Sequence, residues 1–177
     1  MKKLLIIAGL LFATLGASAQ FHADLRAGAT ASAIGDQHLK MGIRAGAGVE
    51  YLFTERWGLR SGLFFSMKGA TTSNNVFNYD ADKATRLSCL DLPVEALVSF
   101  RLSQRSRLAL HGGPYVSCLL HASVPDDAGF DVRRWEIGAG FDADFIIGPE
   151  IQYGLTRLTK PGSGHNTTYA VTLGYRF

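Results

Sequence analysis

The chain has 177 residues, of which 47% are hydrophobic and 19% are charged, and it carries 20 glycines but only five prolines. This content of apolar and aromatic residues excludes a disordered chain, two cysteines exclude a disulfide-dense small domain, and the length allows one domain and hardly two. The formal net charge of +3 comes without any basic run, which excludes a nucleic-acid footprint.

The first 19 residues have the features of a secretory signal peptide. Lys2 and Lys3 precede an apolar run over residues 4–15 that is too short to span a bilayer, and Ala17 and Ala19 provide a small-residue cleavage site. We therefore expect residues 1–19 to be removed and 20–177 to form the mature domain. No comparable apolar run follows, which excludes a protein that crosses the membrane with helices.

Beyond the signal peptide, apolar and polar residues alternate with period two, which indicates strands with one apolar face. The predicted strands lie around residues 21–30, 41–53, 57–68, 90–100, 108–120, 135–145, 150–156 and 169–177. Most are about ten residues long, which is enough to cross a hydrocarbon layer when tilted. The sequence thus predicts an all-β fold, an eight-stranded antiparallel up-and-down transmembrane β-barrel.

The predicted connections alternate between short and long. Short turns are expected at residues 54–56, 103–106 and 146–148, and longer polar loops at 32–39, 69–85, 122–132 and 159–167. Short turns at one rim and long loops at the other are typical of outer-membrane barrels. We therefore expect the cell outer membrane as the location, with periplasmic termini and extracellular long loops.

Period two alone also fits a soluble, lipocalin-like barrel with an apolar interior. However, the polar face carries many glycines, among them Gly46, Gly62 and Gly138, and small residues suit the crowded concave side of a narrow barrel. The apolar face carries aromatic residues near both strand ends, as interfacial girdles do. These are Phe53, Trp57, Phe100, Phe145, Tyr175 and Phe177 near the short turns, and Phe65, Trp135 and Tyr169 near the long loops.

The last strand places Tyr169, Val171, Leu173, Tyr175 and Phe177 on one face and ends the chain in phenylalanine. Such a strand can close a barrel with a continuous lipid-facing stripe. It is similar to the C-terminal signature by which the barrel assembly machinery recognises outer-membrane proteins.

Short fragments in a characteristic order carry a family resemblance. They are Leu90-Asp91-Leu92-Pro93-Val94-Glu95, Gly112-Gly113-Pro114-Tyr115-Val116, Glu136-Ile137-Gly138-Ala139-Gly140, Tyr153-Gly154-Leu155-Thr156 and Leu173-Gly174-Tyr175-Arg176-Phe177. Over essentially the whole mature chain, the sequence resembles the PorT-like outer-membrane β-barrel family of Bacteroidota. The resemblance implies an eight-stranded barrel in the outer membrane and brings no catalytic motif with it.

An eight-stranded barrel has room for interior side chains but none for an aqueous channel. The residues expected in its lumen are Arg26, Arg44, Arg60, Lys68, Glu50, Asp91, Glu95, His111, Glu136, Asp142 and Glu150. Buried charges need partners, so we predict a structural polar network that plugs the barrel. Each strand faces the one four places along, and counting from the rims pairs Arg44 with Glu136 and Arg60 with Glu150. The alternative is an acid–base site or a gated ion path in the same cluster.

No motif of a metalloprotease, α/β-hydrolase, paired-cysteine metal site or phosphate-binding loop occurs, so we expect neither an enzyme nor a bound metal or cofactor. A lipid-modifying enzyme is the alternative. It would need a serine and a histidine at the loop rim, for which the sequence offers Ser66, Ser88 and Ser123 with His121 and His165, without a spacing that selects a triad.

The expected function is therefore that of a small non-enzymatic outer-membrane barrel with structural, adhesion or partner-binding roles at its surface loops. A component of a secretion or assembly system is a further alternative. Expected partners are outer-membrane lipid and lipopolysaccharide, the barrel assembly machinery, and a protein or glycan at the loops, with the barrel itself a monomer. Whether Cys89 and Cys118 form a disulfide stays open, because strict alternation places them on opposite faces.

Overall fold

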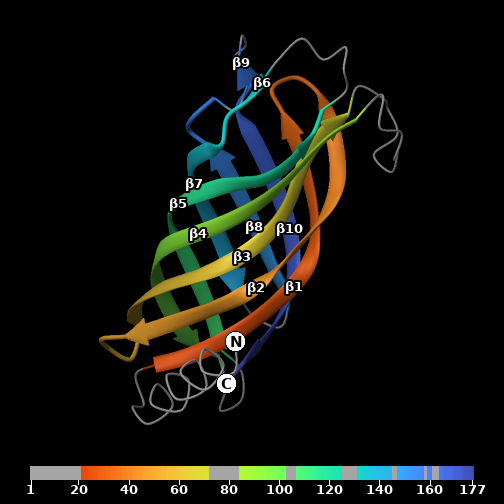
Figure 1. Ribbon diagram of the computed structural model, residues 1–177. Coiled ribbons are helices and arrows are strands. Elements are labelled where there is room, and N and C mark those ends of the chain that lie inside the picture. Colours follow the sequence, from red (N-terminus) through yellow and green to blue (C-terminus); the bar gives the residue numbers. More distant parts are fainter. Residues whose placement is uncertain are drawn as a thin grey trace, which may run out of the picture.

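The structure is a computed structural model that describes residues 21–71, 84–102, 107–124, 131–144, 147–157, 159–160 and 164–177. These residues form a tilted, closed barrel of antiparallel strands with a small two-stranded sheet beyond one end (Figure 1). The described ranges contain no helix of the length and apolarity needed to cross a membrane. The predicted signal peptide, residues 1–19, lies outside them.

Eight long strands make the barrel. They are β1 (Phe21–Ile34), β2 (His38–Leu52), β3 (Trp57–Thr71), β4 (Ala84–Arg101), β5 (Arg107–Ser123), β7 (Trp135–Asp144), β8 (Ile147–Gly154) and β10 (Asn166–Arg176). Each pairs with its neighbours in chain order, and β10 closes the barrel on β1, from Asp24 opposite Arg176 to Ile34 opposite Asn166. The predicted eight-stranded antiparallel barrel is confirmed. The sequence did not predict β6 (Asp131–Val132) and β9 (Thr159–Lys160), which pair with each other.

One connection that the sequence predicts to be long is a tight turn. β1 continues to Ile34 and β2 begins at His38, so only residues 35–37 connect them. Gly35 permits this turn because its φ of 59° lies in the left-handed region, which glycine adopts without steric cost. The predicted loop over 32–39 is therefore wrong. Ser32 instead belongs to the barrel wall, where its hydroxyl donates to the carbonyl of Gly69 and accepts from that residue's N–H.

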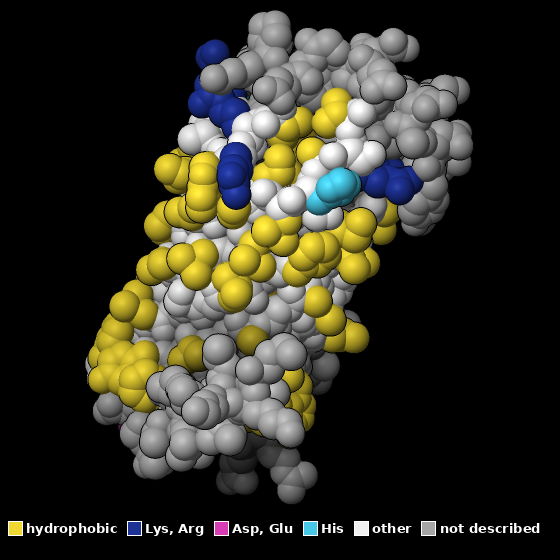
Figure 2. Space-filling view, in the orientation of Figure 1, with side chains coloured by type: hydrophobic (Ala, Val, Ile, Leu, Met, Phe, Trp, Pro, Cys, Tyr) yellow, Lys and Arg dark blue, Asp and Glu magenta, His cyan; other side chains and the backbone are white. Residues whose placement is uncertain are grey.

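The outer face of the barrel is an apolar band (Figure 2). Leu25, Ile43, Leu59, Val94 and Ile137, from five different strands, are each about half exposed. The predicted girdle residues Phe53, Trp57, Phe100, Trp135, Tyr169, Tyr175 and Phe177 are exposed, Phe65 is half-buried, and Phe145 lies outside the described residues. An apolar outside around a charged inside is the reverse of a lipocalin-like barrel, which excludes that alternative.

The glycines of the inner face make room for large interior side chains. A Cβ atom on Gly46 or on Gly62 would lie 2.6 Å from the ring of Phe64. Likewise, a Cβ atom on Gly138 would lie 2.5 Å from the ring of Tyr115. Carbon atoms that are not bonded to each other cannot approach that closely. The two lumenal aromatic rings therefore fit only because the wall beside them carries glycines, which have no side chain.

An apolar cluster, which we call the loop-end cap, closes the lumen at the end opposite the chain termini. Its members are Ile34, Ala70, Leu87, Cys89, Leu119, Ala122 and Val132. A bulge in β5 builds part of it: Ser88 lies opposite His121 and Cys89 opposite Leu119, so that Leu120 is an extra residue. The bulge changes the alternation, so that Ala122 packs inward as Leu119 does.

Candidate functional site

The interior of the barrel is filled with charged side chains, because every second residue of each strand points inward. Ten of the eleven residues predicted for the lumen are buried, and the eleventh, Glu150, has a side chain only 10% exposed. We refer to these residues, together with Asp24, as the lumenal network.

Asp142 on β7 lies at the centre of the lumenal network. Its Oδ2 accepts hydrogen bonds from Nη1 of Arg26 at 2.8 Å and from Nη1 of Arg60 at 2.9 Å. Arg60 also pairs with Glu95 at 3.4 Å, and Arg26 pairs with Asp24 at 3.4 Å. The contacts of Asp142 join β7 to β1 and to β3, and β7 shares no backbone hydrogen bonds with either of these strands.

Arg44 on β2 forms a second set of contacts. Its Nη1 lies 2.5 Å from Oδ2 of Asp91, and its Nε lies 3.1 Å from Oε2 of Glu150 across the lumen. The hydroxyl of Ser66 donates to the same Asp91 oxygen at 2.8 Å. Charge-assisted hydrogen bonds of this kind compensate for the loss of water around a buried guanidinium.

A third cluster lies toward the loop-end cap. The Nζ atom of Lys68 is 3.2 Å from Asp91 and 3.4 Å from Glu136, and it lies 4.8 Å from the ring centroid of Tyr115. The Tyr115 hydroxyl donates to Glu136, and Asn166 donates to the same oxygen at 3.4 Å. Lys68 and Asp91 are each two residues from a member of the cap, so this cluster lies directly beneath it.

Glu50 closes the lumen at the turn end. Its Oε2 accepts from Nη2 of Arg107 at 2.7 Å and lies 3.4 Å from Nη1 of Arg176. His111 lies between Glu50 and the centre, with Nε2 3.5 Å from Glu50 and Nδ1 3.3 Å from Asp142. The ring therefore connects the turn-end contacts with the central ones.

The predicted partners within the lumenal network are wrong, although the predicted members are buried together. Glu150 pairs with Arg44, whereas Glu136 pairs with Lys68. The prediction placed each residue along the barrel axis by counting from the strand end, and it neglected the stagger between strands that a closed barrel requires. This stagger shifts residues on facing strands relative to each other along the axis.

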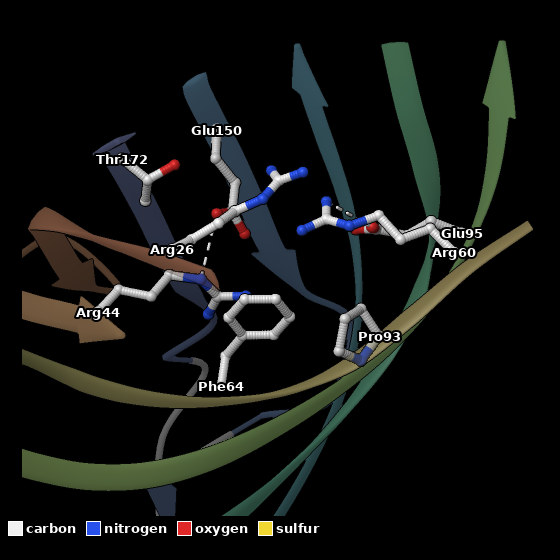
Figure 3. A pocket seen from close by; sticks show the side chains of 8 residues that line it. All are labelled: Arg26, Arg44, Arg60, Phe64, Pro93, Glu95, Glu150 and Thr172. Atoms are coloured by element: carbon white, nitrogen blue, oxygen red, sulfur yellow. Dashed lines mark hydrogen bonds and ion pairs between the residues drawn. The ribbon is translucent and has the colours of Figure 1, made fainter. Parts of the chain in front are cut away.

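The space left between these side chains is small. A cavity of about 10 Å³ lies among Arg26, Arg44 and Arg60, which is room for about one water molecule. The ring of Phe64 fills the adjoining space, with its centroid 4.7 Å from Cζ of Arg44 and 5.5 Å from Cζ of Arg60 (Figure 3). At this level the lumen is packed like a protein core.

Sequence reasoning missed Phe64, Asn166, Arg107 and Arg176 as parts of the interior. The signal for Phe64 was present, since it is two residues from Gly62 and from Ser66 on the inward-facing positions of its strand. The aromatic pair with Phe65 hid it, because aromatic residues in membrane strands are expected to face lipid. Arg107 and Arg176 lie at strand ends, where the alternation alone does not distinguish the lumen from the rim.

The residues considered for catalysis do not form a nucleophile–base pair. Ser66 is buried, and its hydroxyl donates a hydrogen bond to Asp91. Nδ1 of His165 lies 2.9 Å from the carbonyl oxygen of Gly154. Ser88 and His121 are opposite each other in β4 and β5. In the ranges that the structure describes, no hydrogen bond joins Ser66, Ser88 or Ser123 to either histidine, and no group of three or more His, Cys, Asp or Glu could hold a metal ion.

Cys89 and Cys118 are both free. Cys89 lies in the loop-end cap, and its opposite residue on β5 is Leu119, while Cys118 lies opposite Leu90. The β5 bulge follows these positions and does not bring the two sulfur atoms to the same face.

A closed barrel that presents an apolar band outward and encloses a packed, charged interior has the architecture of an outer-membrane protein. The chain belongs to the family of outer membrane protein beta-barrel domains, whose sequence model matches residues 11–170. The protein is thus a small eight-stranded barrel of the outer membrane.

Several solved structures are similar to this chain. Ail, the attachment invasion locus protein of Yersinia pestis, is 15% identical, with 89% of this chain and 99% of that chain covered and a TM-score of 0.46. OprG from Pseudomonas aeruginosa is 11% identical, with coverages of 90% and 97% and a TM-score of 0.48. A de novo designed transmembrane β-barrel is 12% identical, with coverages of 88% and 95% and a TM-score of 0.36. No curated protein gives a significant sequence match.

Proposed function

We propose that the protein is a non-enzymatic, non-conducting outer-membrane barrel, which anchors and presents its loop-end segments for structural, adhesion or partner-binding roles. The observation that carries this proposal is the closure of the lumen at three levels. Glu50 with its two arginines closes the turn end, the lumenal network fills the middle, and the loop-end cap covers the other end.

Conduction would require these levels to open together. An ion crossing the centre would have to displace Asp142 from Arg26 and Arg60, which are 6% exposed or less. Separating a buried ion pair leaves uncompensated charges and costs several kcal/mol for each ion. The apolar cap adds a second barrier of a different kind, because it offers a permeating ion no polar ligands.

We also propose an orientation of the barrel in the membrane and a processing step. We place the turn end, where β1 begins and β10 ends, in the periplasm, and the loop end outside the cell. Residues 1–19 are the cleaved signal peptide in this proposal, and the terminal stripe of Tyr169 to Phe177 serves recognition by the barrel assembly machinery. The PorT-like subgroup of outer-membrane barrels is the membership that the sequence fragments favour.

Conductance of the purified full-length barrel in a planar bilayer tests the central claim. We expect no stepwise current at moderate voltage, while a 16-stranded porin in the same bilayer conducts, because only wider barrels hold an aqueous channel. Stable current steps from the folded barrel, identified by its heat-modifiable migration on a gel, would overturn the proposal.

Cysteine labelling in whole cells tests the orientation. Asp36→Cys places a thiol in the exposed turn after β1, and Glu55→Cys places one in the exposed turn after β2. We expect a membrane-impermeant maleimide to label Asp36→Cys in intact cells and Glu55→Cys only after the outer membrane is permeabilised. The reverse pattern would invert the orientation without affecting the conductance result.

A further inference from the structure

His111 is a buried, titratable side chain whose presence the closure of the lumen alone does not explain. It is 1% exposed, and Leu97, the residue opposite it on β4, is 0% exposed, so the ring is shielded from bulk water. A histidine ring has two nitrogen atoms, and in the neutral form one of them donates a hydrogen bond while the other accepts one. The partners of the two nitrogen atoms therefore determine which form the barrel holds.

Both nitrogen atoms of His111 face carboxylate oxygens. Nε2 lies 3.5 Å from Oε1 of Glu50, and Nδ1 lies 3.3 Å from Oδ1 of Asp142. In each carboxylate the other oxygen atom is the one that pairs with two arginines, Oε2 in Glu50 and Oδ2 in Asp142. Each acid thus presents one oxygen atom to guanidinium groups and the other to the same histidine ring.

Only the doubly protonated, positively charged ring matches this arrangement. A neutral ring would point the lone pair of one nitrogen atom at a carboxylate oxygen, and such a pair is repulsive where water does not screen it. Arg60 on β3 and Glu95 on β4 also act on the ring, but their charges are opposite in sign and the two residues pair with each other at 3.4 Å. Glu50 and Asp142 are therefore the deciding charges.

The two carboxylates are not held equally well. Asp142 pairs with two central arginines whose side chains are 5% exposed or less. Glu50 pairs with Arg107 and Arg176 near the rim, whose side chains are 21% and 29% exposed, and its register partner on β1, His22, is half-buried. Water can therefore hydrate Glu50 and its arginines more easily than Asp142. A neutral ring would keep its proton toward Asp142 and release Glu50.

We propose that His111 is a proton-binding site that ties the turn-end closure to the centre of the lumen, and that loss of its proton to water in the alkaline range releases Glu50 and opens the turn end. The loop-end cap contains no titratable partner of His111, so the opening stops below it and creates no continuous path for ions. The inference goes beyond the proposed function, since a barrel that conducts nothing at any pH can still open at one end.

NMR spectroscopy of the full-length barrel in lipid nanodiscs, with nitrogen-labelled histidine, tests the state of the ring. We expect both ring nitrogens of His111 to carry a proton at neutral pH and one of them to lose it as the pH is raised. Backbone signals around Glu50 and Arg107 should shift over the same pH range, while those of Lys68 and Asn166 should not. A His111 ring with a single proton at neutral pH would overturn the proposal, as would shifts confined to the loop end.

Urea unfolding in liposomes at increasing pH measures the consequence for stability. A histidine of the unfolded chain loses its proton near about pH 6.5, so above this pH the folded barrel holds one proton more and its stability falls as the pH rises. One proton corresponds to a fall of at most about tenfold per pH unit in the folding equilibrium constant.

The wild type and the matched control His121→Gln, which changes an exposed histidine, should both show this fall, and His111→Gln should not. An equal fall in all three proteins would overturn the proposal. Heat-modifiable migration shows whether each variant is folded, and where His111→Gln does not fold, the NMR spectrum of the wild type decides.

Discussion

Arg60 on β3 reaches Asp142 on β7 across the lumen, with 2.9 Å between Nη1 and Oδ2, although β4 and β5 separate these two strands in the wall. The same carboxylate binds Arg26, so one acid holds two buried guanidinium groups. Asp142→Asn keeps the shape of the side chain and removes its charge. We expect it to lower the free energy of unfolding by about 3–5 kcal/mol, because both arginines lose their common anion.

Urea unfolding of the barrel in liposomes, followed by tryptophan fluorescence, measures this loss. Asp36→Asn is the matched control, since it makes the same chemical change in the exposed turn between β1 and β2. It should leave the free energy of unfolding within about 0.5 kcal/mol of the wild-type value, as is usual for surface substitutions. Equal effects of the two substitutions would contradict a stabilising role for the central ion pairs.

The contact between Gly62 and Phe64 predicts a coupling between two substitutions. Gly62→Ala places a Cβ atom 2.6 Å from the Phe64 ring and from the carbonyl of Ala47, so it should destabilise the barrel by about 1–3 kcal/mol. In a Phe64→Leu background the cost should be smaller, because only the contact with the backbone remains. A double-mutant cycle measures this difference.

Gly140→Ala is the control for this cycle. Gly140 also lies on the inner face, but the nearest atom to an added Cβ is Cγ of Gln152 at 3.4 Å, an ordinary contact. We expect little effect on stability in either background. If Gly62→Ala lowers the free energy of unfolding equally with and without the Phe64 ring, the ring does not explain why position 62 needs a glycine.

A charged side chain on the outer face should lower the free energy of unfolding most when it lies near the middle of the membrane. Val171 lies in the middle of β10 and is 55% exposed, while Leu102 lies just beyond the end of β4 at the turn rim and is 61% exposed. Val171→Arg should destabilise the barrel by about 2–4 kcal/mol and Leu102→Arg by at most about 1 kcal/mol, as the depth dependence in bilayers dictates. Unfolding in liposomes gives both values. Equal small effects would contradict contact of this face with hydrocarbon.

The two cysteines should remain reduced in the folded, exported protein. Cys89 packs in the loop-end cap and Cys118 is separated from it by the alternation of the strands. Alkylation in denaturant without reductant should therefore add two labels to the intact mass. A protein that takes up no label until reductant is added would contain a disulfide and would require a different register between β4 and β5.

The alternation of residues was sufficient to predict the eight strands, their closure and the inward-facing charges, because membrane strands must separate apolar from polar side chains at every second residue. It could not predict which charges meet. Arg44 pairs with Glu150 because of the stagger between strands, and the sequence contains no local signal for that stagger. Ala122 was equally out of reach, since it points inward only because the bulge at Leu120 breaks the period, whereas Leu119 continues the inward alternation of Tyr115 and Ser117. Likewise, the turn at Gly35 depends on a single backbone conformation.

The loop-end cap separates two parts of the barrel that can change independently. Above it, residues can be exchanged, inserted or removed without bringing water or a new charge to Lys68 and Asp91, which lie directly below. Below it, the ion pairs depend on exact partners and tolerate little change. A lineage of such barrels would thus be expected to diversify at its surface segments while its interior stays fixed, with a layer only one or two side chains thick as the boundary.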